Sequence, residues 1–247
     1  MLRKTGVLLA IVLVLAGCSS NMFVWSLENG RWLAQYENEL YSLAADIPSI
    51  SQTIDADNRA RAEAMARVFA AEVEERNAQQ QENIGKGIWV LQGESSAIQK
   101  FATSVALIEY AYLPRDAHGS YRIETKTYGA EGEVLNLKSL FLPECDVYRE
   151  LSRLSRWMLM HTGQLGDYTD EKWICAGTEP TADNFSAFLV RPEGLELIFA
   201  PYQIGPWVLG EQRITIPWLH LKGYLTPETE KAVGVAENEG EDMDFAV

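Results

Sequence analysis

The chain has 247 residues and a formal net charge of −14, with 47% hydrophobic and 10% aromatic residues. These fractions are typical of a folded globular protein and exclude a fully disordered chain. The acidic balance argues against nucleic acid and against direct adhesion to anionic lipid, because both are bound by basic surfaces. It favours a cationic partner, or serves solubility alone.

Residues 1–17 have the organisation of a secretory signal peptide. Two basic residues, Arg3 and Lys4, precede an apolar run over residues 7–16. That run is too short to cross a bilayer, which takes about 20 apolar residues. The sequence Leu-Ala-Gly-Cys that ends at Cys18 resembles the bacterial lipobox, where the cut falls before a cysteine that carries diacylglycerol. We expect a lipoprotein whose first mature residue is Cys18, with an ordinary secreted protein as the alternative.

The residue after the cysteine indicates which membrane holds the chain. Further acylation, for example with palmitate, usually follows at such a cysteine, and two or more acyl chains give stable anchoring. Ser19 follows Cys18, whereas an aspartate there resembles the inner-membrane retention signal. The resemblance therefore implies the outer membrane with the chain facing the periplasm, or the outer face of the single membrane in a Gram-positive host.

Residues 18–39 are predicted to be a tether between the lipid and a first module at residues 40–112. Within that module, residues 55–80 should form a helix, because apolar side chains recur there at helical spacing. These side chains are Met65, Val68, Phe69 and Val73. Strands rich in branched and aromatic residues are expected from Tyr41 and over residues 88–91 and 103–113.

A second module is predicted at residues 113–227. Residues 121–128 alternate apolar and polar side chains, which is typical of an antiparallel strand with one solvated face. An amphipathic helix follows at residues 146–161. The remaining predicted elements are a hairpin of residues 185–190 and 195–199 around Pro-Glu-Gly, a strand at 213–216 and a helix at 217–221.

The whole pattern predicts the α+β class, with helices packed on mostly antiparallel sheet in two related or consecutive small modules. Residues 228–247 carry seven acidic residues against one lysine. Such a charge run indicates a solvated, disordered tail.

Two cysteines remain once Cys18 is assigned to lipid. Cys145 and Cys175 form an even pair in an oxidising compartment, which favours a disulfide. That bond would close a loop of about 31 residues and stabilise the fold by roughly 3–4 kcal/mol. Two free thiols are the alternative. A zinc site would need more ligands at usable spacing than these cysteines and the three histidines supply. We therefore expect neither a metal nor another cofactor.

Residues 185–225 carry a family resemblance. They contain Phe-Ala-Pro-Tyr-Gln-Ile-Gly-Pro at 199–206 and Ile-Thr-Ile-Pro at 214–217, and Ala-His-Gly at 117–119 agrees with them. The order resembles the RsiV/PdaC-type extracytoplasmic domain family of unknown function, here with its companion module over residues 40–227 in all. The resemblance implies an α+β fold and, from the lysozyme-sensing members, lysozyme as a partner. No His-x-x-x-His pair of the kind that serves the deacetylase members is present.

Candidate functional residues lie in two loops. His118 invites a catalytic interpretation, but its spacing from Asp116 and Ser120 fits a histidine that ties a loop better than a general base. The second loop combines large rings with glycines that let the backbone turn, as binding surfaces do. Burial of the rings in the core is the alternative, above all for Tyr202. The candidate binding residues are His118 of the first loop and Tyr202, Pro206, Trp207, Val208 and Gly210 of the second.

The sequence thus predicts a lipid-anchored binding module of the cell envelope rather than an enzyme. The expected ligand is a cationic protein such as lysozyme, which would make the chain a lysozyme inhibitor, or a peptidoglycan-related molecule. A peptidoglycan hydrolase and a purely structural envelope lipoprotein are the alternatives.

Overall fold

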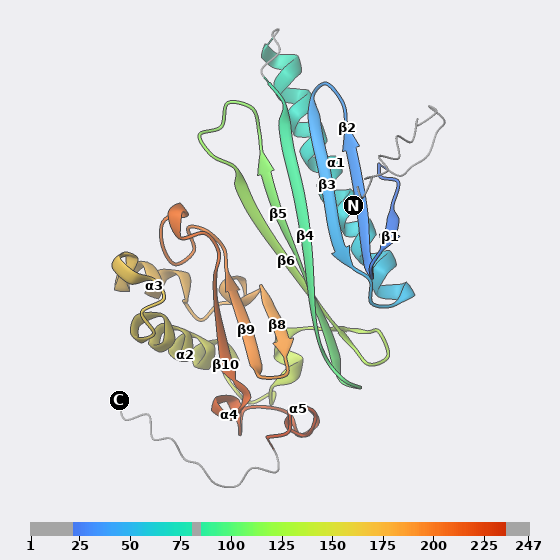
Figure 1. The fold of residues 1–247 in the computed structure, drawn as a ribbon. Coiled ribbons are helices and arrows are strands. Elements are labelled where there is room, and N and C mark those ends of the chain that lie inside the picture. Colours follow the sequence, from blue (N-terminus) through green and yellow to red (C-terminus); the bar gives the residue numbers. More distant parts are fainter. Residues whose placement is uncertain (1–21, 81–84, 236–247) are drawn as a thin grey trace, which may run out of the picture.

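The computed structural model describes residues 22–80 and 85–235, and arranges them in layers (Figure 1). The predicted signal peptide, Cys18 and residues 236–247 of the predicted tail lie outside the described residues. Helix α1 covers one face of a seven-stranded sheet, a three-stranded sheet packs on the other face, and helices α2 and α3 lie beyond it. The α+β class with mostly antiparallel sheet is confirmed.

The large sheet takes its strands in sequence order. Neighbouring strands are antiparallel except β3 and β4, which are parallel and joined by the crossover helix α1 (Gln52–Gln80), as a parallel pair requires. Strands β5 and β6 pair along ten residues, so the predicted boundary between residues 112 and 113 falls inside one continuous sheet. The strands are β1 (Ser26–Glu28), β2 (Arg31–Glu37), β3 (Tyr41–Pro48), β4 (Gly87–Ile98), β5 (Ala102–Tyr112), β6 (Ser120–Gly129) and β7 (Val134–Leu135).

The small sheet carries the second helical layer. Helix α2 packs Leu151 and Leu159 against its outer face, where Val190 and Phe199 are also buried. The predicted Pro-Glu-Gly hairpin is confirmed as β8 and β9. The elements are η1 (Leu137–Leu140), α2 (Val147–His161), η2 (Gly166–Tyr168), α3 (Glu171–Gly177), η3 (Asp183–Phe185), β8 (Phe188–Arg191), β9 (Gly194–Phe199), η4 (Trp207–Leu209), β10 (Gln212–Pro217), α4 (Trp218–Leu221) and α5 (Pro227–Val233).

Helix α1 buries a face shifted from the predicted one. Met65, Phe69 and Val73 are buried as expected, but Val68 is 63% exposed. Each residue advances about 100° around a helix, and buried alanines widen the apolar face on the side away from Val68. These alanines are Ala62, Ala66 and Ala70.

The predicted tether at residues 18–39 is wrong over its described part, which forms β1 and β2. Asn29 and Gly30, both with positive φ, make the tight turn between these strands. The indole of Trp32 donates to Asp55 of α1 at 2.9 Å, and that of Trp25 donates to Glu63 at 3.1 Å. The tryptophans therefore fasten this segment to the helix.

The prediction of a disordered tail from residue 228 is also wrong for its described part. Residues 227–233 form α5, because Thr226 caps the amide of Thr229 and Pro227 suits the first helical turn.

The predicted disulfide is wrong, because Cys145 and Cys175 are both free. Cys145 precedes the start of α2, whereas the carbonyl of Cys175 accepts a hydrogen bond from Arg156, more than two turns into that helix. Each turn rises about 5.4 Å, while disulfide-bonded Cα atoms lie within about 7 Å of each other.

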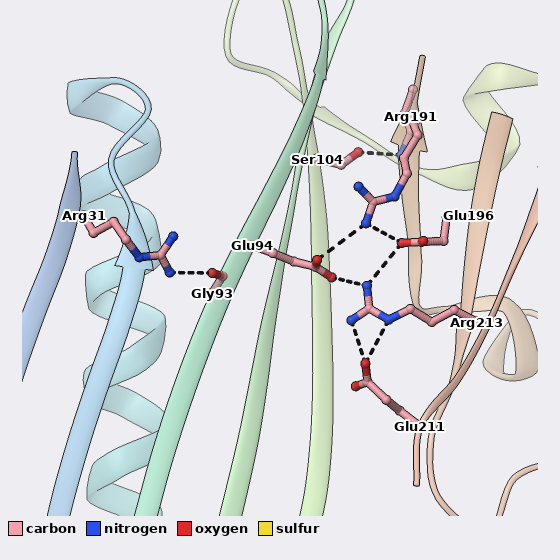
Figure 2. A network of polar contacts seen from close by, with 9 residues as sticks. Arg31, Gly93, Glu94, Ser104, Arg191, Glu196, Glu211 and Arg213 are labelled. Atoms are coloured by element: carbon pink, nitrogen blue, oxygen red, sulfur yellow. Dashed lines mark hydrogen bonds and ion pairs between the residues drawn. The ribbon is translucent and has the colours of Figure 1, made fainter. Parts of the chain in front are cut away.

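Between the two sheets, buried apolar side chains lie beside a group of charged ones. The buried apolar group here consists of Ala106, Leu189 and Ile198. Beside it, Glu94 of β4 points at guanidinium groups of the small sheet (Figure 2). Ser104 of β5 adds a hydrogen bond to the amide of Val190 at 2.9 Å. We call the charged group the ionic clamp; its members are Glu94, Arg191, Glu196, Glu211 and Arg213.

A buried carboxyl in the α1-facing core gives a pH-dependent prediction. Glu109 is 8% exposed and accepts a hydrogen bond from the Trp89 indole. Burial raises its pKa, outweighing that bond and the charge of Arg122. A raised folded-state pKa means that stability is full below the unfolded-state pKa of glutamate and is lost as pH rises through the folded-state pKa.

Glu109→Gln keeps an acceptor for Trp89 and removes the charge. We expect the variant to be about 1 kcal/mol more stable than the parent near pH 8, the low end for removing a buried charge. The gain should vanish near pH 4, around the unfolded-state pKa. Urea unfolding at both pH values measures this difference in the free energy of unfolding. Exposed Glu131→Gln should show no such gain at either pH, and an equal gain in both variants would contradict the assignment.

Candidate functional site

A group of aromatic rings gathers where the β5–β6 loop meets the segment after β9. The ring of Trp207 stacks on that of His118 with centroids 4.3 Å apart and planes at 22°. Its centroid lies 5.2 Å from that of Tyr121 and 6.0 Å from that of Tyr202. Tyr110 joins through Tyr121, at 5.3 Å between centroids. We call these five side chains the aromatic cluster.

The cluster is open to solvent. Tyr202 is 52% exposed and Tyr121 is 39% exposed. His118 is also exposed, while Trp207 is half-buried. The alternative in which the Tyr202 ring is buried in the core therefore fails. Of the other predicted binding residues, Val208 is exposed, and Pro206 and Gly210 are half-buried.

One glutamine fixes the backbone of the loop at residues 200–210. The side-chain amide of Gln203 donates to the carbonyls of Gly177 and Asn184, each at 3.0 Å. Its carbonyl oxygen accepts from the amide of Ala200 at 3.2 Å. The Trp173 indole of α3 donates to the Tyr202 carbonyl at 2.9 Å. These hydrogen bonds therefore hold helix α3 and this loop together.

Tyr202 itself adopts a strained conformation. Its φ of 71° lies in the left-handed region that non-glycine residues rarely enter. Holding it there costs on the order of 1 kcal/mol or more, and such strain is concentrated at functional sites. The bonds from Gln203 and Trp173 stabilise this backbone, and the strain directs the Tyr202 ring toward His118.

His118 has a partner on each ring nitrogen. Nδ1 lies 2.8 Å from the carbonyl oxygen of Gly119, and Nε2 lies 3.3 Å from the Tyr202 hydroxyl. Neither partner is the carboxylate that orients the histidine of a hydrolase triad. The geometry agrees with the predicted loop-tying role.

Two contacts hold the histidine loop in place. Asp116 pairs with Arg76 of α1 at 2.7 Å. Gly119 lies against the Tyr110 ring, so that an added Cβ would come within 2.4 Å of it. A glycine at this position lets the ring lie flat under the loop.

Sequence reasoning found both loops but missed Tyr110 and Tyr121. The alternation at residues 121–128 placed Tyr121 on a strand that begins next to the histidine loop, although the ring is exposed and not on a buried face. That proximity was the available signal. Pairing with Tyr110 depends on the β5–β6 register, which the sequence pattern left open.

Within residues 22–80 and 85–235, no three His, Cys, Asp or Glu side chains are grouped to hold a metal ion. In the same residues, no helix is long and apolar enough to cross a membrane. The aromatic cluster is a surface of ring faces and phenol hydroxyls, which suits binding.

Comparison with known proteins supports the family resemblance. Residues 138–219 match the family described as "Protein of unknown function (DUF3298)". Over 127 residues the chain is 29% identical to the peptidoglycan-N-acetylmuramic acid deacetylase PdaC of Bacillus subtilis. That alignment covers 51% of this chain and 27% of the relative, so the chain spans about a quarter of the relative's length.

The fold comparison extends further along the chain. The crystal structure of a DUF3298 family member from Bacteroides fragilis superposes with a TM-score of 0.60 at 14% identity, covering 89% of this chain and 99% of that one. Residues 138–219 are thus similar to the DUF3298 family, and the chain shares its fold with that protein. Tyr202 and Trp207 lie inside the matched range 138–219, and the other cluster residues precede it.

Proposed function

We propose that this chain is a binding module of the bacterial cell envelope that captures its ligand on the aromatic cluster. One observation carries the proposal: rings from separate segments converge on an exposed surface, and one of them, Tyr202, is held in strained backbone. Aromatic side chains supply large contact areas at low ordering cost and dominate binding hot spots.

The proposed location is extracytoplasmic. The match to a protein named as a peptidoglycan deacetylase and the predicted lipoprotein signal both support it. In this proposal Cys18 carries the lipid, and the chain faces the periplasm from the outer membrane.

The proposed ligand is a cationic protein, with lysozyme as the first to test. The formal net charge of −14 accelerates encounter with a basic partner. Faces of Trp207 and Tyr202 can also attract a lysine or arginine of that partner through cation–π contact. Peptidoglycan fragments, whose sugar rings can lie on aromatic faces, are the second ligand to test.

The proposal predicts the effect of removing the central ring. Trp207→Ala should weaken lysozyme binding by about 30-fold or more, the loss typical of a hot-spot residue. Titration calorimetry with the purified chain measures the Kd. Trp157→Ala is the matched control, since Trp157 is 43% exposed on α2, away from the cluster, and its Kd should equal that of the parent. Equal loss in both variants, or no binding of lysozyme or peptidoglycan fragments at micromolar concentration, would overturn the proposal.

The hydrolase alternative predicts a different result with the same purified chain. A hydrolase would release soluble fragments from purified peptidoglycan, and His118→Ala would abolish the release. We expect none, because His118 is held by a backbone carbonyl and a phenol.

A further inference from the structure

We infer that the β1 edge of the large sheet rests on the lipid surface, which turns the aromatic cluster away from the membrane. The inference rests on the lipid anchoring at Cys18 in the proposed function, and adds to it an orientation and a membrane-contacting surface. That surface consists of Val24 and Leu27, beside the half-buried Trp25.

The distance from the anchor to the fold is short. Phe23 is 3% exposed and packs on Trp89 and Trp25, with ring centroids 6.0 and 5.4 Å away. Four residues, 19–22, separate Phe23 from Cys18. A fully extended chain reaches at most about 3.6 Å per residue, so the two Cα atoms lie within about 18 Å of each other. The folded chain therefore lies against the membrane.

Two exposed apolar side chains lie near the anchor, beside exposed Ser26 and Glu28. Val24 is 64% exposed and Leu27 is 53% exposed, both within four residues of Phe23. Strand β1 is at one end of the strand order, so its outer edge faces no further strand among the described residues. Exposed apolar edges favour association, and proteins normally cover or charge them. In this proposal, the lipid surface that the anchor keeps within reach covers the outer edge of β1.

The strand order sets where the aromatic cluster then lies. Strands β1 and β6 are on opposite sides of the sheet, five strand spacings apart (Figure 1). At about 4.8 Å per spacing this separation is about 24 Å. Tyr121 lies on β6 and His118 in the loop before it. A soluble ligand thus reaches the aromatic cluster without displacing lipid.

Site-specific quenching on vesicles tests the orientation. The full chain, processed and lipidated in a bacterial host, carries Cys145→Ser and Cys175→Ser, and receives one new cysteine with an environment-sensitive fluorophore. Leu27→Cys places the label on the proposed contact, and Val208→Cys is the matched control at a 67% exposed apolar residue beside the aromatic cluster. In phosphatidylcholine vesicles with nitroxide-labelled lipid, we expect several-fold stronger quenching at position 27 than at 208.

Flotation of the chain with the vesicles distinguishes failure of the lipid anchoring from failure of the orientation. A chain that floats but shows equal quenching at both positions overturns the orientation alone. A chain that does not float overturns the lipid anchoring and the orientation with it. A flexible glycine-serine insert after Ser20 should leave flotation intact and abolish the excess quenching at position 27, because it frees the fold from the surface.

Discussion

Replacing Arg213 with methionine should lower the free energy of unfolding by about 3 kcal/mol. Arg213 contacts Glu94, Glu196 at 3.3 Å and Glu211 at 2.8 Å (Figure 2). Without Arg213, the carboxylates of Glu94 and Glu196 both pair with Arg191 alone. Their side chains are 34% and 10% exposed. Removing one partner of a buried ion pair costs about 3–5 kcal/mol, and the partial exposure of Glu94 sets the lower value. Urea unfolding followed by tryptophan fluorescence measures the change.

The control for this prediction is Arg153→Met. Arg153 pairs with Glu150 on α2 at 2.6 Å, but its side chain is 59% exposed, so its loss should cost about 0.5 kcal/mol or less. In addition, Glu196→Gln combined with Arg213→Met should cost less than the sum of the single changes, because the two share one network. Equal costs for Arg213→Met and Arg153→Met would refute a stabilising role for the ionic clamp.

The ionic clamp also connects stability to the candidate site. A buried apolar group, centred on Ala106 and Ile198, lies between the two sheets, and Ala102 of β5 is buried in the core of the small sheet. The ionic contacts add to these apolar contacts in fixing the small sheet against the large one. Since Tyr121 belongs to the large sheet and Trp207 lies between β9 and β10 of the small one, the clamp helps to set the arrangement of the aromatic cluster.

Local periodicity made most elements predictable. The strand at residues 121–128 and the helix at 146–161 agree closely with β6 and α2. In α2 burial on one face imposes a period on the sequence, whereas the polar face predicted to be solvated on β6 pairs with α1 through Glu124 and Lys126. The hairpin of β1 and β2 was missed for a different reason, and a tether was predicted in its place. Its tryptophans and its Asn29-Gly30 turn were visible signals of a hairpin, but the lipobox beside them suggested a linker.

The site was predictable only in parts. His118 and the loop at residues 202–210 stood out individually, yet their contact depends on how two sheets pack, which no local pattern encodes. The disulfide failed for the same reason, because counting residues between Cys145 and Cys175 ignores the helix that holds them apart. Chemistry that depends on distance through space requires the fold.

The last prediction concerns the glycine beneath the binding loop. Gly177→Ala should destabilise the chain by about 3 kcal/mol, the upper range for overpacking. Its added Cβ would lie 1.9 Å from the carbonyl oxygen of Gln203, a backbone atom that cannot rotate away. The loop must then shift and lose the hydrogen bond from the Gln203 amide to the Gly177 carbonyl, so the ring of Trp207 leaves its stack on His118.

Two measurements together decide the outcome for Gly177→Ala. Urea unfolding gives the stability, and near-ultraviolet circular dichroism reports the packing of the aromatic cluster in the variant that remains folded. Lys172→Ala, on the exposed face of α3, should leave both unchanged. If Gly177→Ala kept the parent's stability and aromatic signal, the loop would not depend on α3. If it lost stability and kept ligand affinity, the aromatic cluster would not be the binding surface, because displacing Trp207 must weaken a ligand that contacts it.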